Sequence, residues 1–163
     1  DTELTHLGRN QVRRSAQALW NEGSVDIVYS SPLKRALETA EITARMNFFK
    51  DIVIHASLIE RDFGVLTGVS WERIPDLATE ILHVGDFTYF LEAPKAENFP
   101  ALYERAKVFL DELTEKYPEE RVLCVTHGDL AKMLQAVALN MEWRTALTEI
   151  PYLDNAERVW LPD

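Results

Sequence analysis

Three short segments of the sequence place polar side chains where an apolar stretch ends or a glycine-containing loop turns. In residues 122–129 the apolar run Val-Leu-Cys-Val is followed by Thr-His-Gly and, without a break, by a helical pattern. A helix N-terminus presents unpaired N–H groups and the positive end of the helix dipole, so it attracts anions. Gly128 lets the backbone approach a ligand closely, and the imidazole of His127 can donate a hydrogen bond to a phosphate oxygen. The segment is a candidate phosphate site, unless His127 is a half-buried histidine with structural partners only.

The second segment, residues 29–36, repeats the order of strand, turn and helix start. Its sequence is Tyr-Ser-Ser-Pro-Leu-Lys-Arg-Ala, and it puts Arg35 in the first turn of the predicted helix. A guanidinium presents a planar fork of donors that matches phosphate. Because a helix N-terminus is an unfavourable place for a cation, an arginine there indicates an anionic partner. The alternative is an arginine that is simply solvated.

The third segment, residues 58–64, is a loop that carries Glu60 and ends at Gly64. A carboxylic acid beside a bound phosphate can protonate a leaving oxygen, a contribution of typically ~10²–10⁴-fold to the rate. The alternative is a surface glutamate that pairs with Arg61.

Helices and strands alternate along the chain, and this order must position the three segments. Hydrophobic periodicity, β-branched runs and helix-start residues predict the strands 25–29, 52–54, 121–125 and 156–161 and the helices 5–20, 31–46, 71–82, 100–117 and 129–139. Residues 85–99 show no clear helix or strand pattern and are predicted to be irregular. The alternation predicts a three-layer α/β/α fold with a mostly parallel central sheet. In such a sheet ligands bind at the carboxyl ends of the strands, where Arg35 and His127 would lie.

Composition narrows the classes of function. The 163 residues are 47% hydrophobic, which suits one domain over residues 1–163. The formal net charge of -10 disfavours nucleic acid as a partner. No apolar run approaches the ~20 residues that span a bilayer, so we expect no membrane segment. The single cysteine, Cys124, fits a reducing compartment, and we expect a cytoplasmic location.

The three segments together resemble the histidine phosphatase superfamily, which includes the phosphoglycerate mutases. The matching pieces, in order, are Leu-Thr-His-Leu-Gly (4–8), Ser-Ser-Pro-Leu-Lys-Arg-Ala (30–36), Glu-Arg-Asp-Phe-Gly (60–64) and Thr-His-Gly (126–128). The resemblance implies that Arg35 and His127 bind the phosphoryl group and that Glu60 donates a proton to the leaving group. It also implies that the Gly128 N–H faces the phosphate, and that the reaction uses no metal and no cofactor.

The nucleophile of this superfamily is a histidine in an Arg-His-Gly segment that ends its first strand. No such segment occurs in the 163 residues, and His6 matches a variable position instead. We therefore expect an N-terminally incomplete domain that lacks the first strand and is inactive by itself. The alternative is a natural protein that binds phosphate without catalysis.

Smaller differences from the family bear on the substrate. Mutases of this family usually have tyrosine at the position of Phe63, and they carry a pair of arginines in the insertion that follows. Here residues 85–97 contain no arginine and only Lys95, while Glu97 lies in a changed context at the end of the insertion. A phosphomonoesterase that forms a phosphohistidine intermediate is therefore preferred to a mutase. Its substrate would be a small phosphorylated metabolite.

Overall fold

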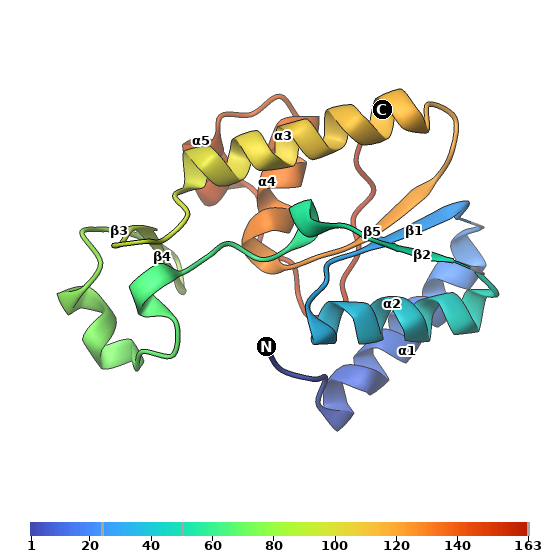
Figure 1. Cartoon of the computed structure of the whole chain (residues 1–163), viewed down its shortest axis with the longest axis horizontal. Coiled ribbons are helices and arrows are strands. Elements are labelled where there is room, and N and C mark those ends of the chain that lie inside the picture. Colours follow the sequence, from blue (N-terminus) through green and yellow to red (C-terminus); the bar gives the residue numbers. More distant parts are fainter. Residues whose placement is uncertain (24, 50, 163) are drawn as a thin grey trace.

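A parallel three-stranded sheet lies at the centre of the fold (Figure 1). The computed structural model describes residues 1–23, 25–49 and 51–162. The strands stand in the order β2-β1-β5, with bounds Ile52–Ile54 (β2), Ile27–Ser30 (β1) and Val122–Val125 (β5). Tyr29 pairs with Val53 on one side and with Cys124 on the other. β1 is thus the central strand, which explains why Val28 and Tyr29 are almost wholly buried.

Helices cover both faces of this sheet (Figure 1). One face carries α1 (His6–Glu22) and α2 (Lys34–Asn47), and the other carries α3 (Phe99–Lys116), α4 (Gly128–Ala138) and α5 (Trp143–Glu149). The side chains of Thr5 and Asn98 cap α1 and α3, accepting from the N–H groups of Gly8 and Ala101. The predicted α/β class with a parallel sheet between helices is confirmed, and α1, α3 and α4 lie where helices were predicted.

A β-hairpin replaces the helix predicted over residues 71–82. The 3₁₀ helix Trp71–Asp76 ends the helical stretch early, and Pro75 inside it lacks the N–H that a longer helix needs. β3 (Glu80–Val84) and β4 (Phe87–Glu92) then pair antiparallel. Gly85 has a φ of 56° and supplies the tight turn between them. Within the interval 85–99, predicted to be irregular, residues 87–92 form the second strand of the hairpin, whereas residues 93–98 belong to no helix or strand.

The start of α2 and the end of the chain also differ from expectation. Ser31 does not cap α2, which begins at Lys34 and has Leu33 at its N-cap. The segment 156–161 forms no strand in the described part of the chain, contrary to the prediction. Instead, the side chain of Arg158 donates to Ser15 and Glu22 of α1, and Trp160 Nε1 donates to Glu22 at 3.3 Å. The segment packs through its side chains on a helix, so its backbone is not part of a ladder.

The loop that carries Glu60 crosses very close to the segment before α3. Gly64 has a φ of 53°, and a Cβ built there would lie 2.5 Å from the Pro94 carbonyl oxygen. Two backbone hydrogen bonds hold the crossing: Val65 N–H donates to Pro94 at 3.1 Å, and Glu97 N–H donates to Asp62 at 2.8 Å. Glycine at position 64 therefore permits the contact that fixes the loop.

We expect Gly64→Ala to destabilise the protein by about 2–4 kcal/mol, because alanine combines a strained left-handed backbone with a clash against residues 94–96. The matched control is Gly68→Ala. Gly68 also has a positive φ, but nothing lies within 4 Å of the added Cβ, so about 1 kcal/mol is expected. Urea unfolding measures both values, and equal losses would show that the crossing is not tight.

Candidate active site

The carboxyl ends of β1 and β5 lie side by side, and α2 and α4 begin there. Ser30 of β1 is opposite Val125 of β5, and the Ser31 N–H donates to the Val125 carbonyl at 2.9 Å. The Thr126 hydroxyl donates to the Leu58 carbonyl at 2.8 Å, which ties the loop of Glu60 to the same edge. The structure thus brings the three segments singled out from the sequence to one edge of the sheet.

His127 is buried at the N-cap of α4, with only 8% of its surface exposed. Its Nε2 lies 2.8 Å from the Ser31 hydroxyl oxygen in a hydrogen bond. Burial, followed by the positive charges of Arg35 and Arg105, lowers the pKa of His127 to about 4. The imidazole is therefore neutral at neutral pH, and an anion placed beside it would favour its charged form. The hydrogen bond to Ser31 was not predicted, because the sequence pattern indicated that Ser31 caps the following helix.

Arg35 lies in the first turn of α2, as predicted, and is half-buried. Its Nη1 is 3.9 Å from a carboxylate oxygen of Asp1, and both oxygens of that carboxylate accept from the Lys34 N–H at 3.1 Å. The start of α2 thus holds an anionic group beside the arginine. This arrangement agrees with the argument that a cation at a helix N-terminus needs a negative partner.

Glu60 is half-buried and faces the first turn of α4. One of its carboxyl oxygens accepts from the Arg61 N–H at 2.8 Å. Burial and then the negative charge of Asp129 raise the pKa of Glu60, whereas the backbone N–H groups of Arg61, Asp129 and Leu130 lower it. A raised pKa favours the protonated acid, the form that can give a proton to a leaving oxygen.

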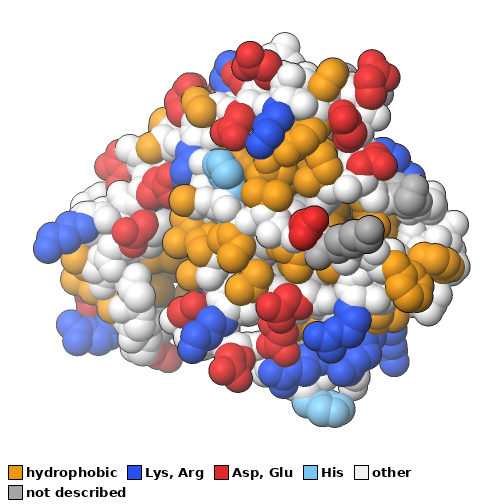
Figure 2. All heavy atoms as spheres, turned by 45° about the vertical axis from the view of Figure 1, so that its right-hand side comes forward, with side chains coloured by type: hydrophobic (Ala, Val, Ile, Leu, Met, Phe, Trp, Pro, Cys, Tyr) orange, Lys and Arg blue, Asp and Glu red, His pale blue; other side chains and the backbone are white. Residues whose placement is uncertain are grey.

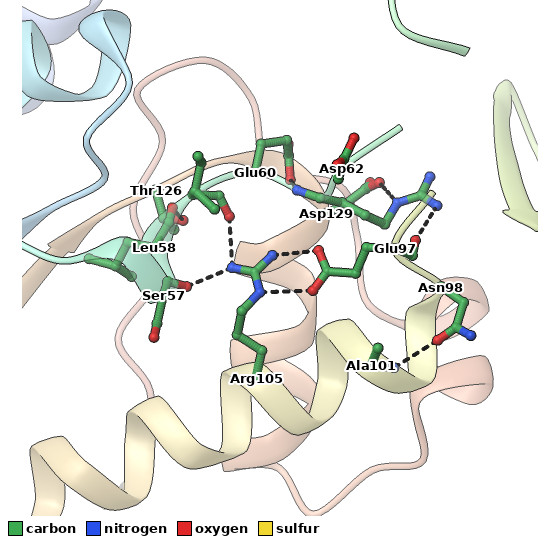
Figure 3. A network of polar contacts seen from close by, with 12 residues as sticks. Ser57, Leu58, Glu60, Asp62, Glu97, Asn98, Ala101, Arg105, Thr126 and Asp129 are labelled. Atoms are coloured by element: carbon green, nitrogen blue, oxygen red, sulfur yellow. Dashed lines mark hydrogen bonds and ion pairs between the residues drawn. The ribbon is translucent and has the colours of Figure 1, made fainter. Parts of the chain in front are cut away.

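The side chain of Arg61 does not pair with Glu60, so the alternative of a surface ion pair is wrong. Arg61 is 4% exposed, and its Nε donates to Asp129 at 2.8 Å (Figure 3). Its guanidinium carbon also lies 4.7 Å from the ring centre of Phe63 and 4.3 Å from that of Phe99. The sequence placed an arginine next to Glu60, but no local pattern separates a buried arginine from an exposed one.

A second ion pair supports the loop from α3. Arg105 donates to both carboxylate oxygens of Glu97, at 2.9 and 2.7 Å, and to the carbonyls of Ser57 and Ile59 at 2.7 and 2.8 Å (Figure 3). These bonds fix the backbone just before Glu60. The sequence offered only a weak reason to place Glu97 near the site. In the structure, the Glu97 side chain is connected to the backbone before Glu60 through Arg105.

Tyr152 explains why position 128 is glycine. A Cβ on Gly128 would collide with the Tyr152 hydroxyl. Burial, together with the charges of Asp129 and Glu60, raises the pKa of Tyr152, so its hydroxyl is neutral and lies within electrostatic range of both carboxyls. The sequence reasoning missed this residue, which reaches the site from the segment after α5. Whether the Gly128 N–H faces a phosphate stays a prediction.

The family model described as histidine phosphatase superfamily (branch 1) matches residues 1–161. The chain belongs to this superfamily. It is 32% identical over 136 residues to phosphoglycerate mutase-like protein 4 of Arabidopsis thaliana, covering 82% of this chain and 59% of that protein. It is 31% identical over 139 residues to a metal-independent phosphoserine phosphatase of the same plant, covering 82% and 57%. The chain therefore spans less than two thirds of the length of these two relatives.

Solved structures show the same fold. The structure of Bacillus stearothermophilus YhfR superposes with a TM-score of 0.80 at 24% identity, covering 96% of this chain and 76% of that one. A phosphoserine phosphatase from Entamoeba histolytica, solved with phosphoserine, superposes with a TM-score of 0.64 at 25% identity, covering 89% and 71%. The fold described above is therefore shared with these solved structures.

Other features of this superfamily member lie outside the site. Among residues 1–23, 25–49 and 51–162, no group of three or more His, Cys, Asp or Glu side chains is arranged to hold a metal ion. None of the helices in these ranges is long and apolar enough to cross a membrane.

Burial raises the pKa of the Cys124 thiol to about 12. On the face shown in Figure 2, basic side chains lie beside acidic ones around a band of apolar ones.

We expect His127 to make stability depend on pH. With a folded pKa of about 4 against 6.5 in the unfolded chain, its contribution is complete above pH 6.5 and is lost as the pH falls to 4. Over that interval the wild type should lose roughly 3 kcal/mol more unfolding free energy than His127→Gln. The control, His83→Gln, removes an exposed histidine of the hairpin and should lose as much as the wild type. Equal losses in wild type and His127→Gln would contradict the assignment.

Proposed function

We propose that the protein is a metal-independent phosphomonoesterase that works through a phosphohistidine intermediate. Arg35 and His127 bind the phosphoryl group, and Glu60 donates the proton to the leaving group. The observation that carries the proposal is that the three segments bearing these side chains, far apart in the sequence, meet at one edge of the sheet. Family membership and the phosphatases among the relatives support the same reaction class.

The charges around His127 favour an anion on electrostatic grounds. His127 is neutral because burial and the positive charges of Arg35 and Arg105 disfavour its protonation. A bound phosphoryl group adds negative charge at this point and raises the pKa of His127, which can then donate a charge-assisted hydrogen bond. The N–H groups at the start of α4, including that of Gly128, add donors aimed at the same group. Charge that develops during transfer is stabilised by groups already in place.

Glu60 completes the reaction by moving a proton. Its protonated carboxyl gives the proton to the ester oxygen as the bond between that oxygen and phosphorus breaks, and the alcohol leaves. The phosphoryl group passes to a histidine nitrogen, the nucleophile of the proposed mechanism. Water then attacks phosphorus and gives one proton back to Glu60, so that free phosphate is released and the acid is restored.

Hydrolysis is favoured over mutase activity by Phe63 and by the residues in the interval 85–97. A mutase needs cations that hold the carboxylate of a sugar-acid phosphate. The one basic residue of the interval 85–97, Lys95, is exposed. At the position where family mutases have tyrosine, the ring of Phe63 packs against the guanidinium of Arg61. The similarity to a phosphoglycerate mutase-like protein keeps phosphoryl transfer between substrates as the second candidate.

The intact protein should hydrolyse phosphomonoesters without added metal and should carry an acid-labile phosphate on a histidine during turnover. Rapid quenching with radiolabelled substrate in alkali, followed by acid treatment, detects that species. An acid-stable label, or phosphate bound without any turnover, would contradict the proposed mechanism. Faster transfer to a second phosphate ester than to water would establish the mutase instead.

We expect Glu60→Gln to impair substrates with poor leaving groups most. An alkyl phosphate needs its leaving oxygen protonated, so its kcat should fall about 10²–10⁴-fold. A nitrophenyl phosphate, whose leaving group is stable as an anion, should lose much less. The control Asp62→Asn removes one charge from the same loop and keeps the oxygen that accepts from the Gly64 N–H. Equal losses for both kinds of substrate would mean that Glu60 does not donate the proton.

A further inference from the structure

Asp129 lies two residues beyond His127 and is held by a buried ion pair. The distance from Arg61 Nε to its Oδ2 is 2.8 Å, and the two side chains are 2% and 9% exposed. Removing either partner would leave an uncompensated charge in a dry interior, which is costly. The pair therefore persists as a unit, and it links the loop of Glu60 to the start of α4.

Further contacts prevent Arg61 from turning away from Asp129. Its Nη1 donates to the carbonyl of Phe90 at 2.8 Å and to that of Glu97 at 3.4 Å. The rings of Phe63 and Phe99 lie near the guanidinium, with their centres 4.7 and 4.3 Å from its carbon. The position of the Asp129 carboxylate is thereby fixed by groups on the hairpin, on the segment before α3 and on α3 itself.

Arg61 connects Asp129 with Glu60. Its backbone N–H donates to the Glu60 carboxyl at 2.8 Å, while its side chain holds Asp129 (Figure 3). We propose that Asp129 is a positioning residue for Glu60: clamped by Arg61, its carboxylate stands beside the Glu60 carboxyl and favours the acid form of Glu60 until the proton is delivered. The catalytic role of Asp129 rests on the proposed function, whereas its electrostatic effect on Glu60 does not.

The titratable groups packed around Glu60 come from its own loop, from α4 and from the segment after α5. The Arg61 guanidinium is directed to Asp129, and Arg61 presents only its backbone N–H to Glu60. His127 is neutral, with a pKa lowered to about 4, and the raised pKa of Tyr152 keeps its hydroxyl neutral. Asp129 raises the pKa of Glu60, second only to burial. Among these groups, Asp129 is the anion that opposes ionisation of Glu60.

Lys132 is a second basic side chain within electrostatic range of Asp129. It is 3% exposed, its ammonium donates to the Ile150 carbonyl, and burial lowers its pKa although the charge of Asp129 acts to raise it. Asp129 therefore has the Arg61 guanidinium in contact and the Lys132 ammonium within electrostatic range, whereas burial favours the acid form of Glu60. Two carboxyls with unequal surroundings take different protonation states, as acid–base catalysis requires.

Two substitutions separate charge from packing. Asp129→Asn keeps the shape and an oxygen acceptor for Arg61 but removes the charge, whereas Asp129→Glu keeps the charge and changes the shape. The readouts are the titration of the Glu60 carboxyl by ¹³C NMR and the pH profile of kcat/KM in the intact protein. Asp62→Asn is the matched control, because it removes a carboxylate from the same loop.

With Asn, the Glu60 titration and the alkaline limb of kcat/KM should both move to lower pH, by more than in the Asp62→Asn control. With Glu, both should stay near the wild type. An unmoved Glu60 titration in Asp129→Asn, or a larger shift with Glu than with Asn, would overturn the proposal in favour of a purely structural role. If Asp129→Asn does not fold, Asp129→Ser, which leaves space for water beside Arg61, replaces it in the same comparison.

The NMR titration needs no turnover, so the two proposals fail separately. A lowered Glu60 titration without hydrolysis of any phosphomonoester would support the role of Asp129 and refute the phosphatase. Hydrolysis with an unmoved titration would support the phosphatase and refute the role of Asp129.

Discussion

Parallel pairing between β1 and β5 is the contact on which the site depends. The ladder sets Ser30 opposite Val125, and one further backbone hydrogen bond, from Ser31 to Val125, carries the pairing past the end of the strands. Because both chains leave the sheet at this point and enter helices, two positive helix ends lie together. The hydrogen bond between Ser31 and His127 joins residues 96 positions apart in the sequence. A change of register by one residue would turn these side chains to the other face.

Burial has opposite effects on the pKa values of the two titratable residues at this edge. It lowers the pKa of His127 and raises that of Glu60, because in each case it disfavours the charged form. His127 is therefore neutral near pH 7, burial favours the acid form of Glu60, and Arg35 and the helix ends supply positive charge.

Two ion pairs lie around the site rather than in it. Arg61 and Asp129, and Arg105 with Glu97, form ion pairs whose remaining donors bind backbone carbonyls of the loop and the hairpin. Buried ion pairs contribute little net stability, but their geometry is restrictive because every partner must be satisfied. In this protein they hold the loop of Glu60 through contacts with β4, with the segment before α3 and with α3. Gly64, where the loop crosses residues 94–96, serves the same end through close backbone contact.

The sequence by itself determined the helices α1, α3 and α4 and the three parallel strands, and it singled out Arg35, Glu60 and His127 as candidate site residues. Periodicity, glycine positions and helix-start residues are local properties, so they can be read from neighbours in the chain. The same reasoning was wrong for the hairpin β3–β4 and for the last segment, whose form depends on which distant surface they pack against. Only the tertiary structure decided that Arg61 is buried, that it pairs with Asp129 and that Ser31 bonds His127. Burial and proximity arise from contacts between distant segments, and these set the protonation states that a sequence pattern does not contain.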